Sequence, residues 1–125
     1  MKHRILVVDD DTSVLQSFEQ ILGGQHQVVT AMDGAEGEEL MDQARNADVP
    51  FDLLISDVNM PIIGGIELIS WVKSNTSDTP CILISSGPDP KFHKADVFIS
   101  KLISPEELGS VVANLLKRGM PAPRG

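Results

Sequence analysis

Short, uninterrupted apolar runs alternate along this 125-residue chain with longer segments of helical periodicity. Three of the runs, at residues 5–8, 53–55 and 81–84, consist almost wholly of isoleucine, leucine and valine. Such runs are typical of strands that are buried on both faces, as in a parallel sheet covered by helices on each side. Two further segments, at residues 26–31 and 97–100, predict strands nearer the edges of the sheet. The alternation therefore predicts an α/β fold.

The segments between the runs carry apolar residues at the spacing of amphipathic helices. The first predicted helix has its apolar stripe between residues 14 and 22 and ends at Gly23 and Gly24. The second runs from Asp33 through residue 46, and the third spans about residues 65–74. The last opens at Ser104, and like the second it begins with a capping box, in which a glutamate follows three residues after the cap.

This order of elements implies right-handed crossovers and a doubly wound sheet, for which two strand orders are common. We predict one domain over residues 1–118. Residues 119–125 contain glycines and prolines that disfavour a helix, so we expect a C-terminal tail or the end of a linker there.

The composition excludes several classes of protein. The net charge is −8 and no block of lysine or arginine occurs, which argues against direct nucleic-acid binding by this chain. No apolar stretch approaches the length of a membrane span, and residues 5–8 are too short for the apolar part of a signal peptide. We therefore expect a cytoplasmic location. The single cysteine, Cys81, lies in an apolar run and is expected in the core.

Polar residues follow four of the predicted strands. Asp9 and Asp10 follow the first, Asp57 the third, Ser85 the fourth and Lys101 the fifth. Ligands of doubly wound sheets bind beyond the carboxyl ends of the strands. Neighbouring strands lie about 4.8 Å apart, so carboxylates at adjacent strand ends repel one another unless a cation joins them. Oxygen ligands without histidine or cysteine favour Mg2+, with Mn2+ as the alternative.

A set of residues spread in order over nearly the whole chain resembles the signature of response-regulator receiver domains: Val7–Val8–Asp9–Asp10, Asp57–Val58–Asn59–Met60–Pro61 with Gly65, Ser85, and Lys101. The resemblance implies a flavodoxin-like doubly wound sheet of five parallel strands in the order 2-1-3-4-5. Receivers of this family are themselves a standard example of that strand order, so the order is taken from the resemblance alone.

The resemblance also implies how a metal and a phosphoryl group are held. Asp57 would accept the phosphoryl group. Asp10 would hold Mg2+ directly and Asp9 through water, while Asp57 and the backbone carbonyl of Asn59 would complete the protein ligands. A carboxylate can accept a phosphoryl group covalently, and the transfer needs positioning and charge neutralisation more than covalent help.

Three further residues would form the switch. Ser85 would place its hydroxyl on the phosphoryl group, Lys101 would pair with the phosphoryl oxygens, and Phe98 would be the aromatic residue that reorients. Lysine's flexible side chain can span the two strand positions, roughly 10 Å, between the fifth strand and the third.

The sequence departs from the family pattern in two places. Receivers usually have a helix between the fourth and fifth strands, but residues 86–95 contain Gly87, Pro88 and Pro90, so we expect that helix to be shortened or replaced by a mobile loop. Leu102 follows Lys101 where the family typically has proline, often with a cis bond. A cis bond before leucine would cost about 2.5–4 kcal/mol, so we expect a trans bond and a different loop path.

The resemblance predicts a receiver that takes its phosphoryl group from a sensor histidine kinase or a phosphotransfer protein and acts on an output partner that the sequence does not name. It would catalyse only its own phosphorylation and dephosphorylation. The alternative is a pseudo-receiver that acts as an interaction module without phosphorylation. An aspartate-nucleophile phosphatase would need an aspartate where Asn59 stands, and a flavodoxin would need a serine- or threonine-rich phosphate loop after the first strand.

Overall fold

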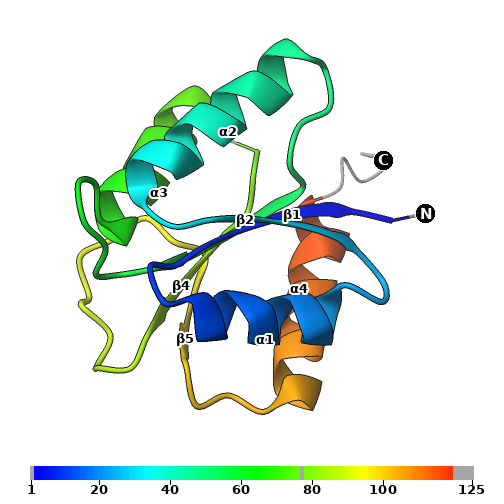
Figure 1. The fold of residues 1–125 in the computed structure, drawn as a ribbon, viewed down its shortest axis with the longest axis vertical. Helices are drawn as coiled ribbons and strands as arrows, with labels where there is room; N and C mark the ends of the chain where they lie inside the picture. The colour runs from blue at the N-terminus through cyan, green and yellow to red at the C-terminus, as the bar shows by residue number, and fades with distance from the viewer. Residues whose placement is uncertain (1, 77, 120–125) are drawn as a thin grey trace.

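The computed structural model describes residues 2–76 and 78–119, which form three layers (Figure 1). A parallel sheet lies in the middle, with helices α1 and α4 on one face and helices α2 and α3 on the other. In chain order the elements are β1 (Arg4–Val8), α1 (Thr12–Leu22), β2 (Gln27–Ala31), α2 (Gly34–Asn46), β3 (Leu53–Asp57), α3 (Gly65–Asn75), β4 (Cys81–Ser85), β5 (Val97–Ser100) and α4 (Pro105–Gly119).

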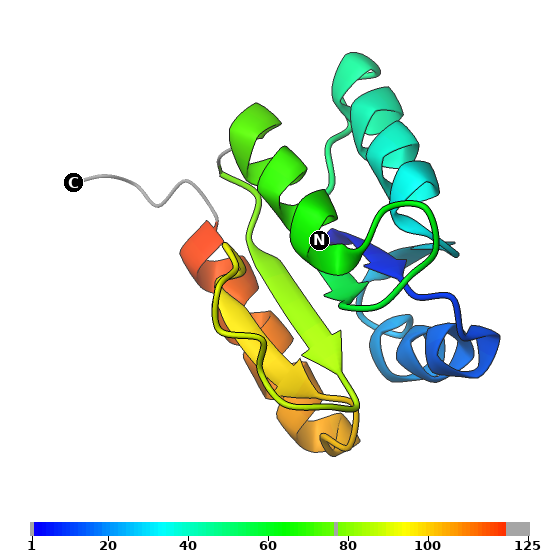
Figure 2. The same ribbon diagram turned by 90° about the vertical axis from the view of Figure 1, so that its left-hand side faces the viewer.

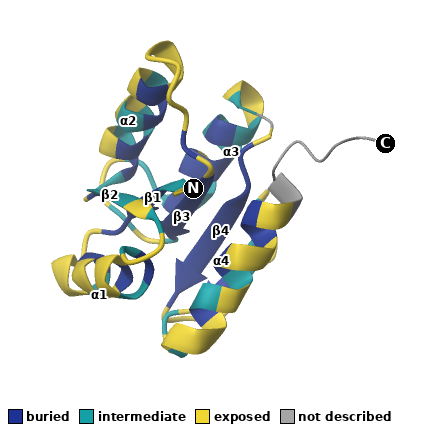
Figure 3. Cartoon of the chain, turned by 90° about the vertical axis from the view of Figure 1, so that its right-hand side faces the viewer, coloured by how far each residue is buried: buried dark blue, intermediate teal, exposed yellow. Residues whose placement is uncertain are grey.

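The five strands are ordered β2-β1-β3-β4-β5, and every neighbouring pair is parallel. The predicted fold class and strand order are therefore confirmed. Every residue of β3 and β4 is buried, which is why their sequences read as continuous apolar runs (Figure 3). The edge strand β2 is mostly half-buried and reads less clearly.

Side chains alternate between two hydrophobic clusters, one on each face of the sheet. Ile5, Val7 and Ile55 point towards α1 and α4, whereas Leu6, Val8 and Leu54 point towards α2 and α3. This alternation follows from the two-residue period of a strand. The clusters fix the sheet between its helices and leave the carboxyl edge for polar residues.

Local side-chain bonds define the helix starts that the sequence predicts. Asp11 caps α1 by accepting the Ser13 N–H, and Ser104 accepts the Glu107 N–H at the start of α4. Asp33 caps α2 by accepting the Glu36 N–H. The Glu36 carboxylate in turn accepts the Met32 N–H, one residue before the position expected in a capping box.

Residues 86–96 connect β4 to β5 without a helix, as the sequence predicts. In Figure 2 this connection runs as a loop alongside β5. Internal bonds hold it: the Asp89 carboxylate accepts the Lys91 N–H and lies 2.9 Å from His93 Nε2, and His93 Nδ1 accepts the Ala95 N–H. Phe92 projects from this loop and is 92% exposed. The mobility of the loop stays a prediction.

Asp96 connects the end of this loop to β4 by hydrogen bonds and to α3 by an ion pair. Its carboxylate accepts the Cys81 N–H at 2.7 Å and pairs with Lys73 Nζ at 2.7 Å, and its own N–H donates to the Cys81 carbonyl. Lys73 also donates to the Thr79 carbonyl at 2.9 Å. The amino end of β5 is thereby fixed without the helix that usually precedes it.

Helix α4 ends at Gly119, one residue past the predicted domain boundary at 118, and the rest of the predicted tail lies outside the described residues. Within the described ranges, no helix is long and apolar enough to cross a membrane.

Candidate metal and phosphoryl site

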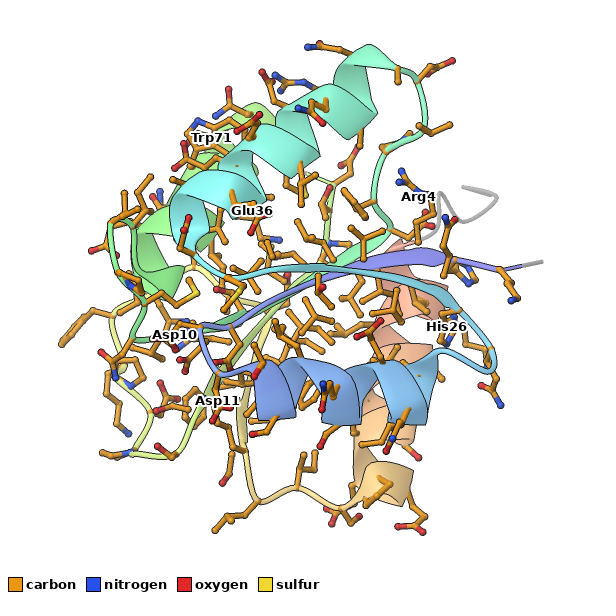
Figure 4. All side chains as sticks on the ribbon, viewed as in Figure 1. Arg4, Asp10, Asp11, His26, Glu36 and Trp71 are labelled. Carbon is orange, nitrogen blue, oxygen red and sulfur yellow. The ribbon has the colours of Figure 1, made fainter. Side chains whose placement is uncertain are left out.

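Asp9, Asp10 and Asp57 meet at the carboxyl edge of the sheet. Asp57 is the last residue of β3, Asp9 and Asp10 follow β1 directly, and the register pairs Val8 with Ser56, so Asp9 and Asp57 end adjacent strands. One carboxylate oxygen from each of the three aspartates lies within 4.8 Å of the other two. Figure 4 shows Asp10 in the connection from β1 to α1, at the opposite end of the sheet from His26.

The three carboxylates differ in burial. Asp9 is fully buried, Asp57 is 5% exposed, and Asp10 is exposed to solvent. The Asp11 N–H donates to Asp9 Oδ1 at 2.9 Å and so orients that carboxylate. Asp9 Oδ2 is buried and has no hydrogen-bond partner among the described residues.

Lys101 reaches the carboxylates from the far side of β4. Its Nζ lies 2.9 Å from Asp9 Oδ2 and 3.4 Å from Asp57 Oδ1. The contact with Asp9 Oδ2 is an ion pair to a buried carboxylate oxygen that has no hydrogen bond among the described residues. The Lys101 N–H donates to the Ser85 carbonyl, which sets the start of the side chain at the end of β4. The bond from Lys101 to Leu102 is trans, as expected, and the departure from proline does not remove the lysine from the site.

Burial and charge set the pKa values at the site. Burial raises the pKa of Asp57 above its ordinary value and the charge of Asp9 raises it further, against the opposing attraction of Lys101. Burial lowers the pKa of Lys101, but its interactions with Asp9 and then with Asp57 outweigh burial, so this pKa lies above its ordinary value. The Lys101 ammonium thus contacts two of the three clustered carboxylates.

This donor set fits a hard divalent cation. The nearby oxygens come from carboxylates, one of them buried without a hydrogen bond, and Asp10 opens the cluster to solvent. Such an arrangement could hold a metal ion that prefers oxygen ligands and keeps bound water. A metal ion there would relieve the repulsion among the three carboxylates.

The other predicted residues lie in β4, in the loop after β3 and in β5. Ser85 ends β4 beside β3 and is buried, and its Oγ accepts the Gly87 N–H at 2.9 Å. Asn59 is exposed in the loop after Asp57. Phe98 lies within β5 opposite Leu83 and is half-buried against the hydrophobic cluster beneath α2 and α3. The roles of these residues stay predictions.

Two contributions to the site were not recognised from the sequence. The Asp11 side chain caps α1, and its backbone N–H also orients Asp9. Gly65 lies so close to Asp57 that a Cβ atom there would come within 1.9 Å of the Asp57 carbonyl oxygen. A glycine after an aspartate-ending strand is a signal for such an approach, although it does not say which atom is approached.

Comparison with known proteins agrees with the fold. Residues 5–113 match the family model of the response regulator receiver domain. The chain belongs to the receiver-domain family of two-component response regulators.

Individual relatives support the same assignment. The chain is 33% identical to the two-component response regulator ARR12 of Arabidopsis thaliana, over 98% of this chain and 21% of that protein. It is 30% identical to the transcriptional regulatory protein PrrA of Mycobacterium tuberculosis, over 95% of this chain and 52% of that protein. The chain thus spans about half or less of these curated relatives. Among solved structures, the chemotaxis protein CheY4 of Vibrio cholerae is 30% identical with a TM-score of 0.80, covering 92% of this chain and 99% of that one.

Proposed function

We propose that Asp57 accepts a phosphoryl group from a histidine kinase or phosphotransfer protein. The observation that carries the proposal is the meeting of three carboxylates with the Lys101 ammonium at one edge of a receiver fold. An oxygen of Asp57 forms the new bond to phosphorus, the bond from phosphorus to the donor nitrogen breaks, and the electron pair of that bond stays with the donor. Water later cleaves the acyl phosphate and restores the carboxylate.

Mg2+ is the proposed metal, with Mn2+ as a substitute. Asp10 and Asp57 would hold it directly, Asp9 through water, and Asn59 through its backbone carbonyl. When bound, Mg2+ would neutralise part of the charge shared by the carboxylates and the phosphoryl oxygens. Asp9 is suited to a fixed role because it is fully buried and its Oδ1 already accepts the Asp11 N–H.

The remaining residues of the proposal receive the transferred group. Lys101 lies 3.4 Å from Asp57 Oδ1, within reach of an oxygen added at that carboxylate. The Ser85 hydroxyl would turn towards the phosphoryl group and give up the Gly87 N–H that it accepts at 2.9 Å. Phe98 would follow this movement from β5. We propose no metabolic substrate: the chain would catalyse only its own phosphorylation and dephosphorylation.

Receiver domains of two-component systems work with histidine kinases or phosphotransfer proteins. That this chain receives its phosphoryl group from such a partner is part of the proposal, which names no output partner. The expectations of a cytoplasmic location and of no direct contact with nucleic acid stay predictions.

Intact-mass measurement after incubation with acetyl phosphate and Mg2+ tests the proposal. Wild type should gain the mass of one phosphoryl group, and Asp57→Asn should gain none. Asp48→Asn is a matched control, because Asp48 is exposed after α2 and has a positive φ that asparagine tolerates. This control should be modified like wild type.

The loop at residues 86–96 supports one competing function, a pseudo-receiver that binds partners without phosphorylation. A protein without the usual helix could present this loop, with its exposed Phe92, as an interaction module. If wild type binds Mg2+ but is never modified by acetyl phosphate, the pseudo-receiver is the better interpretation.

A further inference from the structure

The loop between β3 and α3, residues 58–64, contains a turn with an unfavourable backbone conformation. Ile62 has φ of +72°, a conformation that β-branched residues rarely adopt, and the Ile63 N–H donates to the Pro61 carbonyl at 2.8 Å across it. Ile62 is itself 80% exposed, so its side chain does not hold the turn in place. A strained conformation persists only where its surroundings fix it, so another contact must determine this turn.

Gly34, the first residue of α2, makes that contact. Its N–H donates to the Ile63 carbonyl at 3.2 Å, although the two residues lie on different connections of the sheet. A Cβ atom on Gly34 would lie 2.2 Å from the Ile63 carbonyl oxygen and 2.8 Å from Ile63 Cβ. The loop can therefore occupy this position only if residue 34 has no side chain. In Figures 1 and 2 the loop lies beside the amino-terminal end of α2.

The start of α2 is a firm support for this contact. Asp33 and Glu36 bond to the backbone around Gly34, accepting the N–H groups of Glu36 and Met32. One turn later, a Cβ atom on Gly37 would meet side-chain atoms of Leu68 at 3.1 Å and Val8 at 3.2 Å, so the helix packs closely on α3 and β1. Because α2 is held by these contacts, the loop should be the part that moves when the contact is crowded.

The same loop carries the backbone that the proposed metal site uses. It begins directly after Asp57 and contains Asn59, and it is closed by the Gly65 N–H, which donates to the Val58 carbonyl at 2.9 Å. We infer that Gly34 is a positioning residue for the metal site, because its contact with Ile63 sets the position of the loop that carries Asn59, whose backbone carbonyl the proposed site would use. This inference rests on the proposed function, since it concerns the affinity of that site for its cation.

Replacement of Gly34 by alanine tests the inference, with Mn2+ as the probe and its free ion counted by electron paramagnetic resonance. Changes in the residues that position the ligands of a metal typically lower its affinity about 10–100-fold. We expect Gly34→Ala to raise the dissociation constant for Mn2+ at least about tenfold. The Gly65 amide should also exchange hydrogen faster in the metal-free variant, a readout that needs no metal and no activity.

Gly109→Ala is the matched control, because Gly109 lies inside α4 and a Cβ atom there would meet nothing within 4 Å. Its dissociation constant for Mn2+ should stay within about twofold of wild type, since at this open helix position the added methyl group meets no neighbour and acts on helix propensity alone. Melting in EDTA shows whether each variant is folded before its affinity is compared.

The outcomes separate this inference from the function on which it rests. If wild type binds no Mn2+, the proposed metal site is wrong. If wild type binds Mn2+ and Gly34→Ala binds it equally well, the role of Gly34 alone is wrong. Should Gly34→Ala fail to fold, Asp33→Ala removes the cap that holds the start of α2 against the loop, and an unchanged Mn2+ affinity in that variant would overturn the inference.

Discussion

Cys81 shows how burial alone sets the chemistry of a residue. It is fully buried at the start of β4, and burial raises the pKa of its thiol to about 12. Native protein at pH 8.5 should therefore react with iodoacetamide at least about a hundredfold more slowly than protein in urea, because the reactive thiolate is depleted and shielded. Cys81 is the only cysteine, so mass spectrometry reports it directly. Equal rates in the two conditions would show that the amino end of β4 opens.

His26 predicts a pH dependence of stability. Its Nδ1 is buried without a hydrogen-bond partner among the described residues, and burial followed by the charge of His3 lowers its pKa. A histidine with a lowered pKa in the folded state contributes stability that is present above its unfolded pKa of about 6.5 and is lost as the pH falls below that value. Urea unfolding from pH 7.5 to 5 should show a steeper loss for wild type than for His26→Gln. Parallel curves would mean that the folded protein accommodates the protonated ring.

At the scale of single elements, the main difference from the usual receiver pattern is the loop at residues 86–96, which replaces a helix. The prolines at 88 and 90 prevent a helix, and side chains such as Asp89 and His93 bond the backbone instead. We expect amides across residues 91–95 to exchange hydrogen faster than those of α3, because few of them are in a regular ladder. Exchange as slow as in α3 would contradict this prediction and the mobility expected for the loop.

Asp96 should be the residue on which the end of this loop depends. Its replacement by alanine removes the acceptor of the Cys81 N–H and the partner of Lys73. We expect a loss of about 2 kcal/mol in the free energy of unfolding, since partly buried donors are left unpaired. Urea denaturation measures this, with Glu19→Ala on the exposed face of α1 as a control that should change by less than about 0.5 kcal/mol. A loss no larger than the control's would show that the loop holds β5 by other contacts.

At the scale of the whole molecule, what the sequence could predict depends on the range of the interaction. Strands and helix starts were predictable because burial of an entire strand and caps such as Ser104 leave local patterns. The meeting of Asp9 with Asp57 followed from the parallel sheet and the resemblance together. The contact of Gly34 with Ile63 joins two separate connections, and no local pattern encodes it. The reach of Lys101 across β4 was likewise settled only by the folded chain.

A bound cation should raise the free energy of unfolding of the whole domain, because the three clustered carboxylates repel one another without it. Binding to the native state alone adds RT ln(1 + [L]/Kd), about 2.7 kcal/mol at a hundredfold excess of ligand over Kd. For a domain of this size that free energy corresponds to a rise in melting temperature of roughly 10 °C.

Saturating Mg2+ should therefore raise the melting temperature of wild type, and Asp10→Ala should lose most of that rise because it removes the exposed carboxylate of the cluster. In EDTA the same variant should melt at or above wild type, since repulsion with Asp9 and Asp57 is relieved. A wild-type melting temperature that is the same in EDTA and in saturating Mg2+ would count against the site, whereas a response that survives in Asp10→Ala would place the cation elsewhere on the molecule.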